Sequence, residues 1–239
     1  MTNEQMLSQG ANELNIELTP DIAQAMLKYM DFMLEWNEKV NLTTITQPEE
    51  VIIKHFLDSL TLIATVEIGS NSKIIDVGTG AGFPAIPLKL VRPDIKLTML
   101  DSLGKRVNFL KEACAHVGIK GAECLHGRAE DLAQNPDYRE KFDIATARAV
   151  AGLNVLCEYC LPFVKVGGHF LAMKGPDVME ELKAAEKAIS VLGGKINAVK
   201  SFKLPFSDIT HSIVVIEKIK KCSTSFPRKA GKPSKEPII

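Results

Sequence analysis

The segment that most constrains this chain is Lys73–Pro87, which reads K-I-I-D-V-G-T-G-A-G-F-P-A-I-P. Ile74, Ile75 and Val77 form a short apolar run typical of a buried strand, and glycines follow at positions 78, 80 and 82. Glycine permits positive φ angles and a close approach of the backbone to a ligand, and Pro84 suits the first turn of a helix. The segment therefore predicts a strand, a tight turn and a helix start, an arrangement at which open α/β sheets bind nucleotides.

Two carboxylates near this turn bear on which nucleotide it binds. The glycines follow G-x-G-x-G rather than the dinucleotide pattern G-x-G-x-x-G, and Phe83 stands where the third dinucleotide glycine would be. Asp76 would repel a pyrophosphate but suits a cationic ligand with an amino group, such as S-adenosylmethionine. Asp101 closes the apolar run 95–100 and can accept hydrogen bonds from both hydroxyls of a ribose. These residues favour S-adenosylmethionine over a dinucleotide or a glycine turn without a ligand.

Further short motifs are spread in order along the whole chain. They are N-L-T at 41–43, H-F-L-D-S at 55–59, D-S-x-x-K-R at 101–106, G-R-A-E at 127–130, A-R-A at 147–149 and F-P-R-K-x-G-x-P at 226–233. Together with D-V-G-T-G-A-G-F-P-A-I-P, they resemble the RsmG family (glucose-inhibited division protein B), whose members are bacterial methyltransferases of small-subunit ribosomal RNA. Several separated motifs in the right order are far more specific than one glycine loop.

The resemblance implies a fold, a cofactor and a set of binding residues. The implied fold is the class I S-adenosylmethionine-dependent methyltransferase fold, a Rossmann-like α/β architecture with a seven-stranded, mostly parallel sheet and an N-terminal helical extension. S-adenosylmethionine would be the cofactor and S-adenosylhomocysteine the product, with no metal and no assigned catalytic residue. The cofactor-binding positions that match the family lie after the first four strands: Gly78, Phe83, Asp101, Ser102, Ala129, Glu130 and Arg148.

The pattern from Ser72 onward agrees with such a fold, because short apolar strands alternate with helical segments. It predicts strands at 73–77, 95–101, 122–126, 142–147, 168–174, 195–204 and 212–219. The last two have no helix-length segment between them, so we expect a hairpin in which one strand runs antiparallel to the rest. A covering helix is expected over 178–192, where apolar and charged residues occupy different faces.

The chain divides into three regions: a helical region at 1–70, a methyltransferase domain at 71–220 and a basic mobile tail at 221–239. The first region should contain a helix that starts near Pro20, with an apolar stripe that ends at Trp36, which we interpret as core rather than as a base-stacking platform. A second helix should run from Glu49 to about Thr65. His55 and Asp58 share a face of it; their spacing alone favours a capping or interhelix contact, whereas the resemblance raises a role at the cleft.

Composition limits the class of protein. The chain has 239 residues, 46% hydrophobic and 24% charged, which is ordinary for a globular protein. No apolar stretch approaches the ~20 residues of a membrane span, and the first residues do not form a signal peptide, so a cytoplasmic protein without membrane contact is expected. The five cysteines fit reduced thiols, and Cys157-x-x-Cys160 lacks the second pair that a structural zinc site needs.

Charge points to a partner. The net charge is zero, but residues 217–239 carry seven Lys or Arg against two Glu. A basic tail can bind RNA phosphate, although many short basic termini are only solvated. This feature alone therefore favours RNA binding and a solvated tail about equally. With the resemblance, the expected partner is 16S ribosomal RNA or the small ribosomal subunit, bound by a monomer. The candidates for holding RNA are Arg148, Lys174, Arg228 and Lys229.

The acceptor atom follows by elimination together with the resemblance. Enzymes that methylate exocyclic amines carry an Asn- or Asp-Pro-Pro-aromatic motif after the fourth strand, where this chain reads T-A-R-A-V-A, and no cysteine nucleophile for pyrimidine carbon-5 stands there. Guanine N7 needs no general base, which is consistent with the family's activity, guanine-N7 methylation of 16S ribosomal RNA. The alternatives are a methyltransferase of a small molecule or protein, a non-catalytic S-adenosylmethionine-binding regulator and a nicotinamide oxidoreductase.

Overall fold

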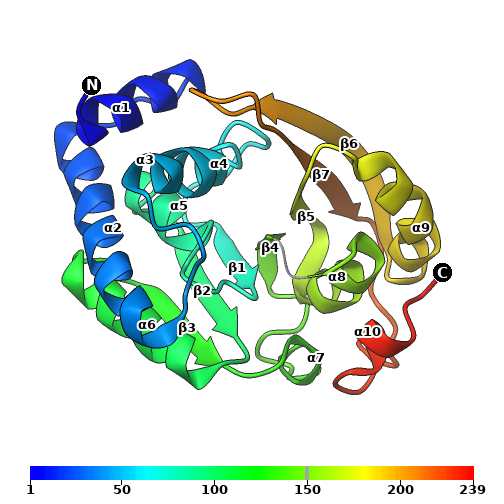
Figure 1. Cartoon of the computed structure of the whole chain (residues 1–239). Helices are drawn as coiled ribbons and strands as arrows, with labels where there is room; N and C mark the ends of the chain where they lie inside the picture. The colour runs from blue at the N-terminus through cyan, green and yellow to red at the C-terminus, as the bar shows by residue number, and fades with distance from the viewer. Residues whose placement is uncertain (149–150) are drawn as a thin grey trace.

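The computed structural model describes residues 1–148 and 151–239 and is built on a seven-stranded sheet with the order β3-β2-β1-β4-β5-β7-β6 (Figure 1). The strands are β1 (Lys73–Val77), β2 (Lys96–Asp101), β3 (Ala122–His126), β4 (Phe142–Arg148), β5 (Val164–Lys174), β6 (Gly194–Lys203) and β7 (Thr210–Lys218). The first five strands are parallel, and β7 pairs antiparallel with both β5 and β6. The predicted α/β class, the seven strands and the final hairpin are therefore confirmed.

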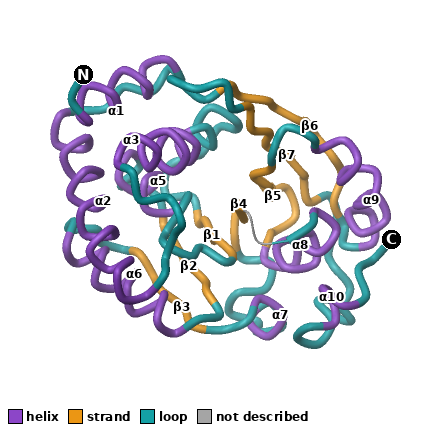
Figure 2. The backbone as a smooth tube through the Cα atoms, viewed as in Figure 1, coloured by secondary structure: helices purple, strands orange, loops and turns teal. Residues whose placement is uncertain are grey.

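Helices cover both faces of this sheet (Figures 1 and 2). The elements before the sheet are α1 (Asn3–Glu13), α2 (Pro20–Val40), α3 (Pro48–Val51), a π-helical segment (Ile52–Leu57) and α4 (Asp58–Leu60). Those within it are α5 (Ala85–Val91), α6 (Gly104–His116), α7 (Ala129–Leu132), α8 (Leu153–Cys160), a 3₁₀ turn (Leu161–Phe163) and α9 (Val178–Val191), and α10 (Lys232–Lys235) follows it. Among the described residues, no helix is long and apolar enough to cross a membrane.

Alternate residues of the strands enter two separate apolar cores. On one face, Ile74 and its neighbours pack with α1, α2, α5 and α6. On the other face, Ile75 and Val77 pack with α8, α9 and part of the C-terminal segment. This alternation follows from the two-residue period of a strand, and it is why β1 reads as a continuous apolar run interrupted only by Asp76.

The N-terminal helical region shares the first of these cores. Helix α2 starts as the sequence indicates, with the Thr19 hydroxyl accepting a hydrogen bond from the backbone N–H of Ile22 and Pro20 in the first turn. Met26, Tyr29 and Met33 of its apolar stripe are buried, and Trp36 is partly buried against the same cluster. The second expected helix is interrupted, because residues 52–57 form a π-helical turn, a feature that occurs frequently at functional sites.

The C-terminal segment packs against the sheet domain rather than extending from it. Expected as a mobile tail, residues 221–239 follow the outside of α7 and α8 in the structure, and α10 contacts α8 (Figure 1). Pro227 and Pro233 are buried. The low apolar content of the segment gives no indication of this packing in the sequence. Its contacts are mostly hydrogen bonds and one ion pair to residues far away in the sequence.

Candidate active site

The glycine turn after β1 takes the conformation that its sequence predicts. Gly78, Gly80 and Gly82 all have positive φ, at 73°, 61° and 86°. A Cβ on Gly82 would lie only 2.6 Å from the Ile86 side chain and 3.0 Å from the Tyr29 hydroxyl, so this position has neither the conformation nor the space for a larger residue. The Tyr29 hydroxyl donates a hydrogen bond to the backbone oxygen of Ala81, which ties α2 to the turn.

Asp101 lies at the end of β2, beside this turn, and is almost fully buried. Its Oδ2 accepts the backbone N–H of Gly80 at 2.9 Å and its Oδ1 accepts the N–H of Leu103 at 2.9 Å. A carboxylate has about four acceptor sites, so lone pairs remain for a ligand. The hydrogen bonds hold the Asp101 side chain at the point where two cavities meet.

The first of these cavities extends from Asp101 toward β3 and α7. It has a volume of about 240 Å³ and is lined by residues that include Gly78, Ser102, Ala129 and Glu130. Tyr159 of α8 and Ser234 of α10 complete its wall. Four of the predicted cofactor positions, together with Asp101, therefore line one cavity.

The second cavity extends from Asp101 in the other direction and has a volume of about 350 Å³. The glycine turn, Phe83, Thr43, His55 and Arg148 line it. Phe83 is only 4% exposed, because the His55 ring stacks on it with centroids 4.6 Å apart and the Arg148 guanidinium lies 5.3 Å from its centroid. Phe83 thus supports the polar residues of this cavity as well as lining it.

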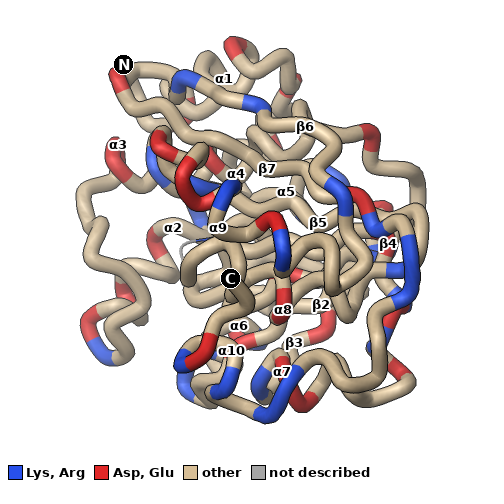
Figure 3. Tube along the Cα trace, turned by 90° about the vertical axis from the view of Figure 1, so that its right-hand side faces the viewer, with Lys and Arg blue, Asp and Glu red and all other residues tan. Residues whose placement is uncertain are grey.

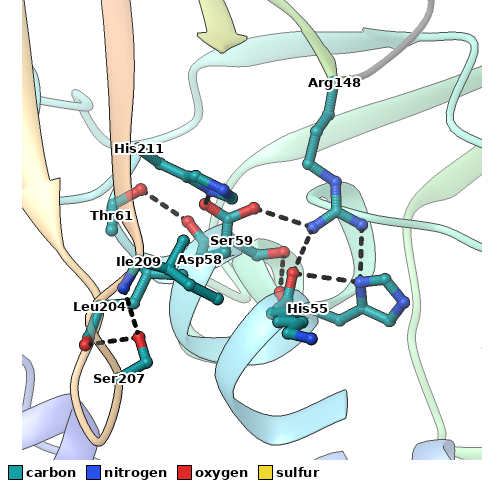
Figure 4. A network of polar contacts seen from close by, with 10 residues as sticks. His55, Asp58, Ser59, Thr61, Arg148, Leu204, Ser207, Ile209 and His211 are labelled. Atoms are coloured by element: carbon teal, nitrogen blue, oxygen red, sulfur yellow. Dashed lines mark hydrogen bonds and ion pairs between the residues drawn. The ribbon is translucent and has the colours of Figure 1, made fainter. Parts of the chain in front are cut away.

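Arg148 is held by a polar network that joins three distant parts of the chain (Figure 4). Its Nη1 donates to Asp58 Oδ2 at 2.9 Å and to the backbone oxygen of Lys54 at 3.0 Å. The other Asp58 oxygen lies 2.7 Å from Nδ1 of His211, on β7. Asp58 is 1% exposed, so this ion pair with Arg148 is largely shielded from water.

His55 is neutral in this network. Burial, followed by the nearby Arg148 charge, lowers the pKa of His55 from 6.5 to about 4. Nδ1 of His55 lies 3.1 Å from both Arg148 Nη2 and the Lys54 backbone oxygen. Because a guanidinium can only donate, the contact with Arg148 requires Nδ1 to accept, and Nε2–H then donates to the Thr43 hydroxyl at 3.0 Å. Both ring nitrogens are therefore engaged, which leaves His55 without a free lone pair for a proton.

A third cavity lies on the far side of His55 and Arg148. It has a volume of about 490 Å³ and combines the apolar Ile45, Met173 and Ile209 with charged residues. Lys174 lies in its wall, where its ammonium group donates to the Ala151 backbone oxygen and pairs with Glu181, each at 2.7 Å. His55 and Arg148 line both this cavity and the one at the glycine turn.

Asp76 has an unusual environment beneath the glycine turn. Its Oδ2 accepts the Thr79 hydroxyl at 2.6 Å, but Oδ1 has no hydrogen-bond partner within the described parts of the chain. Burial raises the pKa of Asp76 from 3.8 to about 7. A buried and incompletely paired carboxylate next to a ligand cavity is typical of functional sites rather than of structural ones.

The sheet order with its antiparallel β7, and the cavities at the carboxyl ends of β1 to β4, are those of the class I methyltransferase fold. Solved structures share this fold: TrmN from Thermus thermophilus (18% identity, TM-score 0.54, covering 68% of this chain and 48% of that one) and a SAM dependent methyltransferase from Aquifex aeolicus (18%, 0.52, covering 72% and 94%). The chain belongs to the GidB family, rRNA small subunit methyltransferase G, which matches residues 22–212.

Two full-length relatives agree with this family. The "Ribosomal RNA small subunit methyltransferase G" of Alkaliphilus oremlandii is 57% identical over 238 residues, covering 100% of both chains. The protein of the same name from Thermoanaerobacter sp. is 50% identical over 234 residues, covering 98% of each. The predicted family is therefore confirmed over the whole chain.

All seven predicted cofactor positions line the two adjoining cavities, with Phe83 and Arg148 in one and Ala129 and Glu130 in the other. Ala149, in the A-R-A motif, lies outside the described residues. Three of the four candidates for holding RNA are already in ion pairs: Arg148 with Asp58, Lys174 with Glu181 and Arg228 with Glu158. Sequence reasoning missed Thr43, Tyr159, His211 and Ser234. Only Thr43, in N-L-T, lay in a motif that pointed to the site.

Proposed function

We propose that this chain transfers a methyl group from S-adenosylmethionine to N7 of a guanine in 16S ribosomal RNA of the small subunit. Family membership supports the reaction class. The single observation that carries the proposal is that the cavity at the glycine turn and the 490 Å³ cavity meet at His55 and Arg148. A methyl donor on one side and an acceptor base on the other would face each other there.

The residues of the first two cavities fit the proposed cofactor. Asp101 and Ser102 would hold the ribose, and Ala129 and Glu130 would border the adenine. The unpaired Asp76 oxygen favours a cationic ligand, since positive charge nearby stabilises the ionised carboxylate. When bound, S-adenosylmethionine supplies an electrophilic methyl group on a sulfonium centre.

The residues at the junction fit an acceptor atom that is already nucleophilic. Neutral His55 has both nitrogens engaged, and Arg148 cannot accept a proton, so neither is available as a general base. Guanine N7 has an unprotonated lone pair and needs none. The work of the chain is then to align the base between Met173 and Arg148 and to exclude water, which can lower the barrier by several kcal/mol.

RNA must be opened for such an enzyme to act. N7 lies in the deep, narrow groove of an A-form helix, so the target guanine has to be in a loop or displaced into the cavity. Lys and Arg positions lie near α7 and α10, with acidic positions among them (Figure 3), and the exposed lysines there would contact phosphates. Lys229, which is exposed, remains a candidate for this contact.

The test is transfer of labelled methyl from S-adenosylmethionine to small-subunit RNA, or to particles, from cells that lack this protein, followed by nucleoside analysis. We expect 7-methylguanosine at one position. Asp101→Ala should abolish cofactor binding and transfer, whereas Asp131→Ala, an exposed carboxylate on α7, should leave both unchanged. Label in any other nucleoside, or none with the cofactor still bound, would refute the proposal.

A further inference from the structure

The C-terminal segment Ser223–Ile239 is fixed to the domain through an almost fully buried carboxylate. Glu158 of α8 is 1% exposed at its side chain and accepts four hydrogen bonds from Arg228. They come from the backbone N (2.8 Å), Nε (2.9 Å to Oε1 and 3.1 Å to Oε2) and Nη2 (2.6 Å). A two-point guanidinium–carboxylate pair of this kind fixes position and orientation together.

A second anchor lies at the start of the same segment. The guanidinium of Arg139 donates to the backbone oxygens of Cys222, Ser223 and Phe226 at 2.7 to 3.0 Å. The Gln134 side chain donates to the oxygens of Thr224 and Pro227. Side chains of the domain therefore hold the backbone of the segment at several successive residues, which defines its path without a large apolar core.

Beyond these anchors the segment reaches the 240 Å³ cavity. The backbone N–H of Gly231 donates to Glu130 Oε1 at 2.8 Å, and Gly231 has a φ of 81°, which turns the chain at this point. Ser234, three residues later, lines the cavity together with Gly127 and Ala129. Glu130 is 6% exposed, and no other hydrogen bond to its carboxylate is found in the described parts of the chain.

We propose that residues 228–234 form the outer wall of the adenosine end of the cofactor cavity and orient the Glu130 carboxylate toward the adenine. The inference deepens the proposed function and rests on it. Arg228 is then a positioning residue that acts through Gly231 and Ser234, and not an RNA contact, because its donors are directed at Glu158. This arrangement explains two residues of the F-P-R-K-x-G-x-P motif: Arg228 anchors the segment to Glu158, and Gly231 allows the chain to turn.

Hydrogen exchange of the full-length protein with and without S-adenosylhomocysteine tests the wall directly. We expect slower exchange in two peptides, one that contains the glycine turn at 78–82 and one that contains 228–234. Protection of the glycine turn alone would overturn the wall while leaving the cofactor site intact. Protection of neither peptide would overturn the cofactor site and the wall with it.

Variants of the full chain test the positioning role. Arg228→Ala should raise the Kd for S-adenosylhomocysteine and the KM for S-adenosylmethionine about tenfold, the worth of one charged hydrogen bond, with kcat at saturating cofactor within about twofold. Arg228→Lys should recover part of this loss. The control Lys221→Ala removes an exposed charge just before the segment, outside the proposed wall, and should leave the Kd unchanged. An unchanged Kd in Arg228→Ala, or an equal rise in the lysine control, would overturn the proposal.

Discussion

Replacing Asp76 by Asn should stabilise the unliganded protein at alkaline pH while weakening cofactor binding. Asp76 is 0% exposed, accepts one hydrogen bond from Thr79, and has a second oxygen without a partner among the described residues. The substitution keeps the size of the side chain and an acceptor for Thr79, and it removes only the titratable charge. Asp76 is therefore a position where stability and function should oppose each other.

The magnitude follows from the raised pKa. The ordinary pKa of this carboxyl is 3.8 and its folded-state pKa is about 7, so between these values the folded protein holds a proton that the unfolded chain has released. The free energy of unfolding therefore falls as pH rises through this window, by on the order of 4 kcal/mol in all. The Asn variant does not titrate and so keeps this stability, but its unpaired buried amide lowers the free energy of unfolding by about 1–3 kcal/mol. We expect net stabilisation of about 1–3 kcal/mol at pH 8.

The assay is urea unfolding of wild type and Asp76→Asn from pH 5 to pH 8. The difference between the two unfolding free energies should grow by about 3 kcal/mol over this range in favour of the variant and stay constant at higher pH. Comparing the two proteins cancels the other titrating groups. A difference that is independent of pH would refute a raised Asp76 pKa.

The effect of Asp76→Asn on cofactor binding should be opposite to its effect on stability: the variant should bind S-adenosylmethionine more weakly than the wild type. A cationic ligand favours the ionised carboxylate, so the wild-type affinity for S-adenosylmethionine should fall about tenfold from pH 8 to pH 6, with proton release on binding. The variant should bind more weakly and without this pH dependence; measuring it at the same pH values removes the ligand's own titration. Calorimetry in two buffers of different ionisation enthalpy measures both the affinity and the proton release. Equal affinity and equal pH dependence in the two proteins would show that Asp76 does not act on the ligand.

Two further predictions concern the glycine turn and the Arg148 network. Gly82→Ala should lower the free energy of unfolding by about 2–4 kcal/mol, because strain at positive φ adds to the close contact with Ile86. Gly118 also has positive φ but open space around it, so Gly118→Ala should lower the free energy of unfolding by only about 1 kcal/mol. Equal losses for the two variants in thermal or urea unfolding would contradict the steric reasoning. Asp58→Asn should lower the free energy of unfolding by about 3 kcal/mol, since Arg148 loses a buried counter-charge. It should also reduce kcat at least about tenfold, because the guanidinium is no longer held in position. Single-turnover methyl transfer measures the rate, and an unchanged rate would exclude a positioning role for Asp58.

Local sequence patterns were sufficient for most of the fold. Strands β1 and β3 begin and end at the predicted residues, and the others differ mainly at their ends, most of all β5, which starts four residues earlier than expected. These elements follow from local signals: apolar runs for strands, glycines for the turn after β1, and a threonine cap with proline for α2. Such signals are contained within a few residues and do not depend on distant partners.

The cofactor end of the site was also predictable, because its residues follow directly after consecutive strands. Parallel strands bring their carboxyl ends to one edge, so Gly78, Asp101 and Glu130 had to lie near one another once the sheet was expected. Arg148, at the end of β4, joined them for the same reason.

Only the tertiary structure decided what surrounds these residues. His211 meets Asp58 across 153 positions of sequence, and Gly231 meets Glu130 across 101. The first contact exists because the antiparallel β7 lies beside β5, and the second because Arg228 and Arg139 fix the path of a polar segment that looks mobile on composition alone. The sequence by itself determined the strands, the glycine turn and the acidic residues that follow them. The two cavities that meet at Arg148, and the wall at Ser234, depend on side chains that strand order and long-range hydrogen bonds bring together, and these have no signature in any short stretch of sequence.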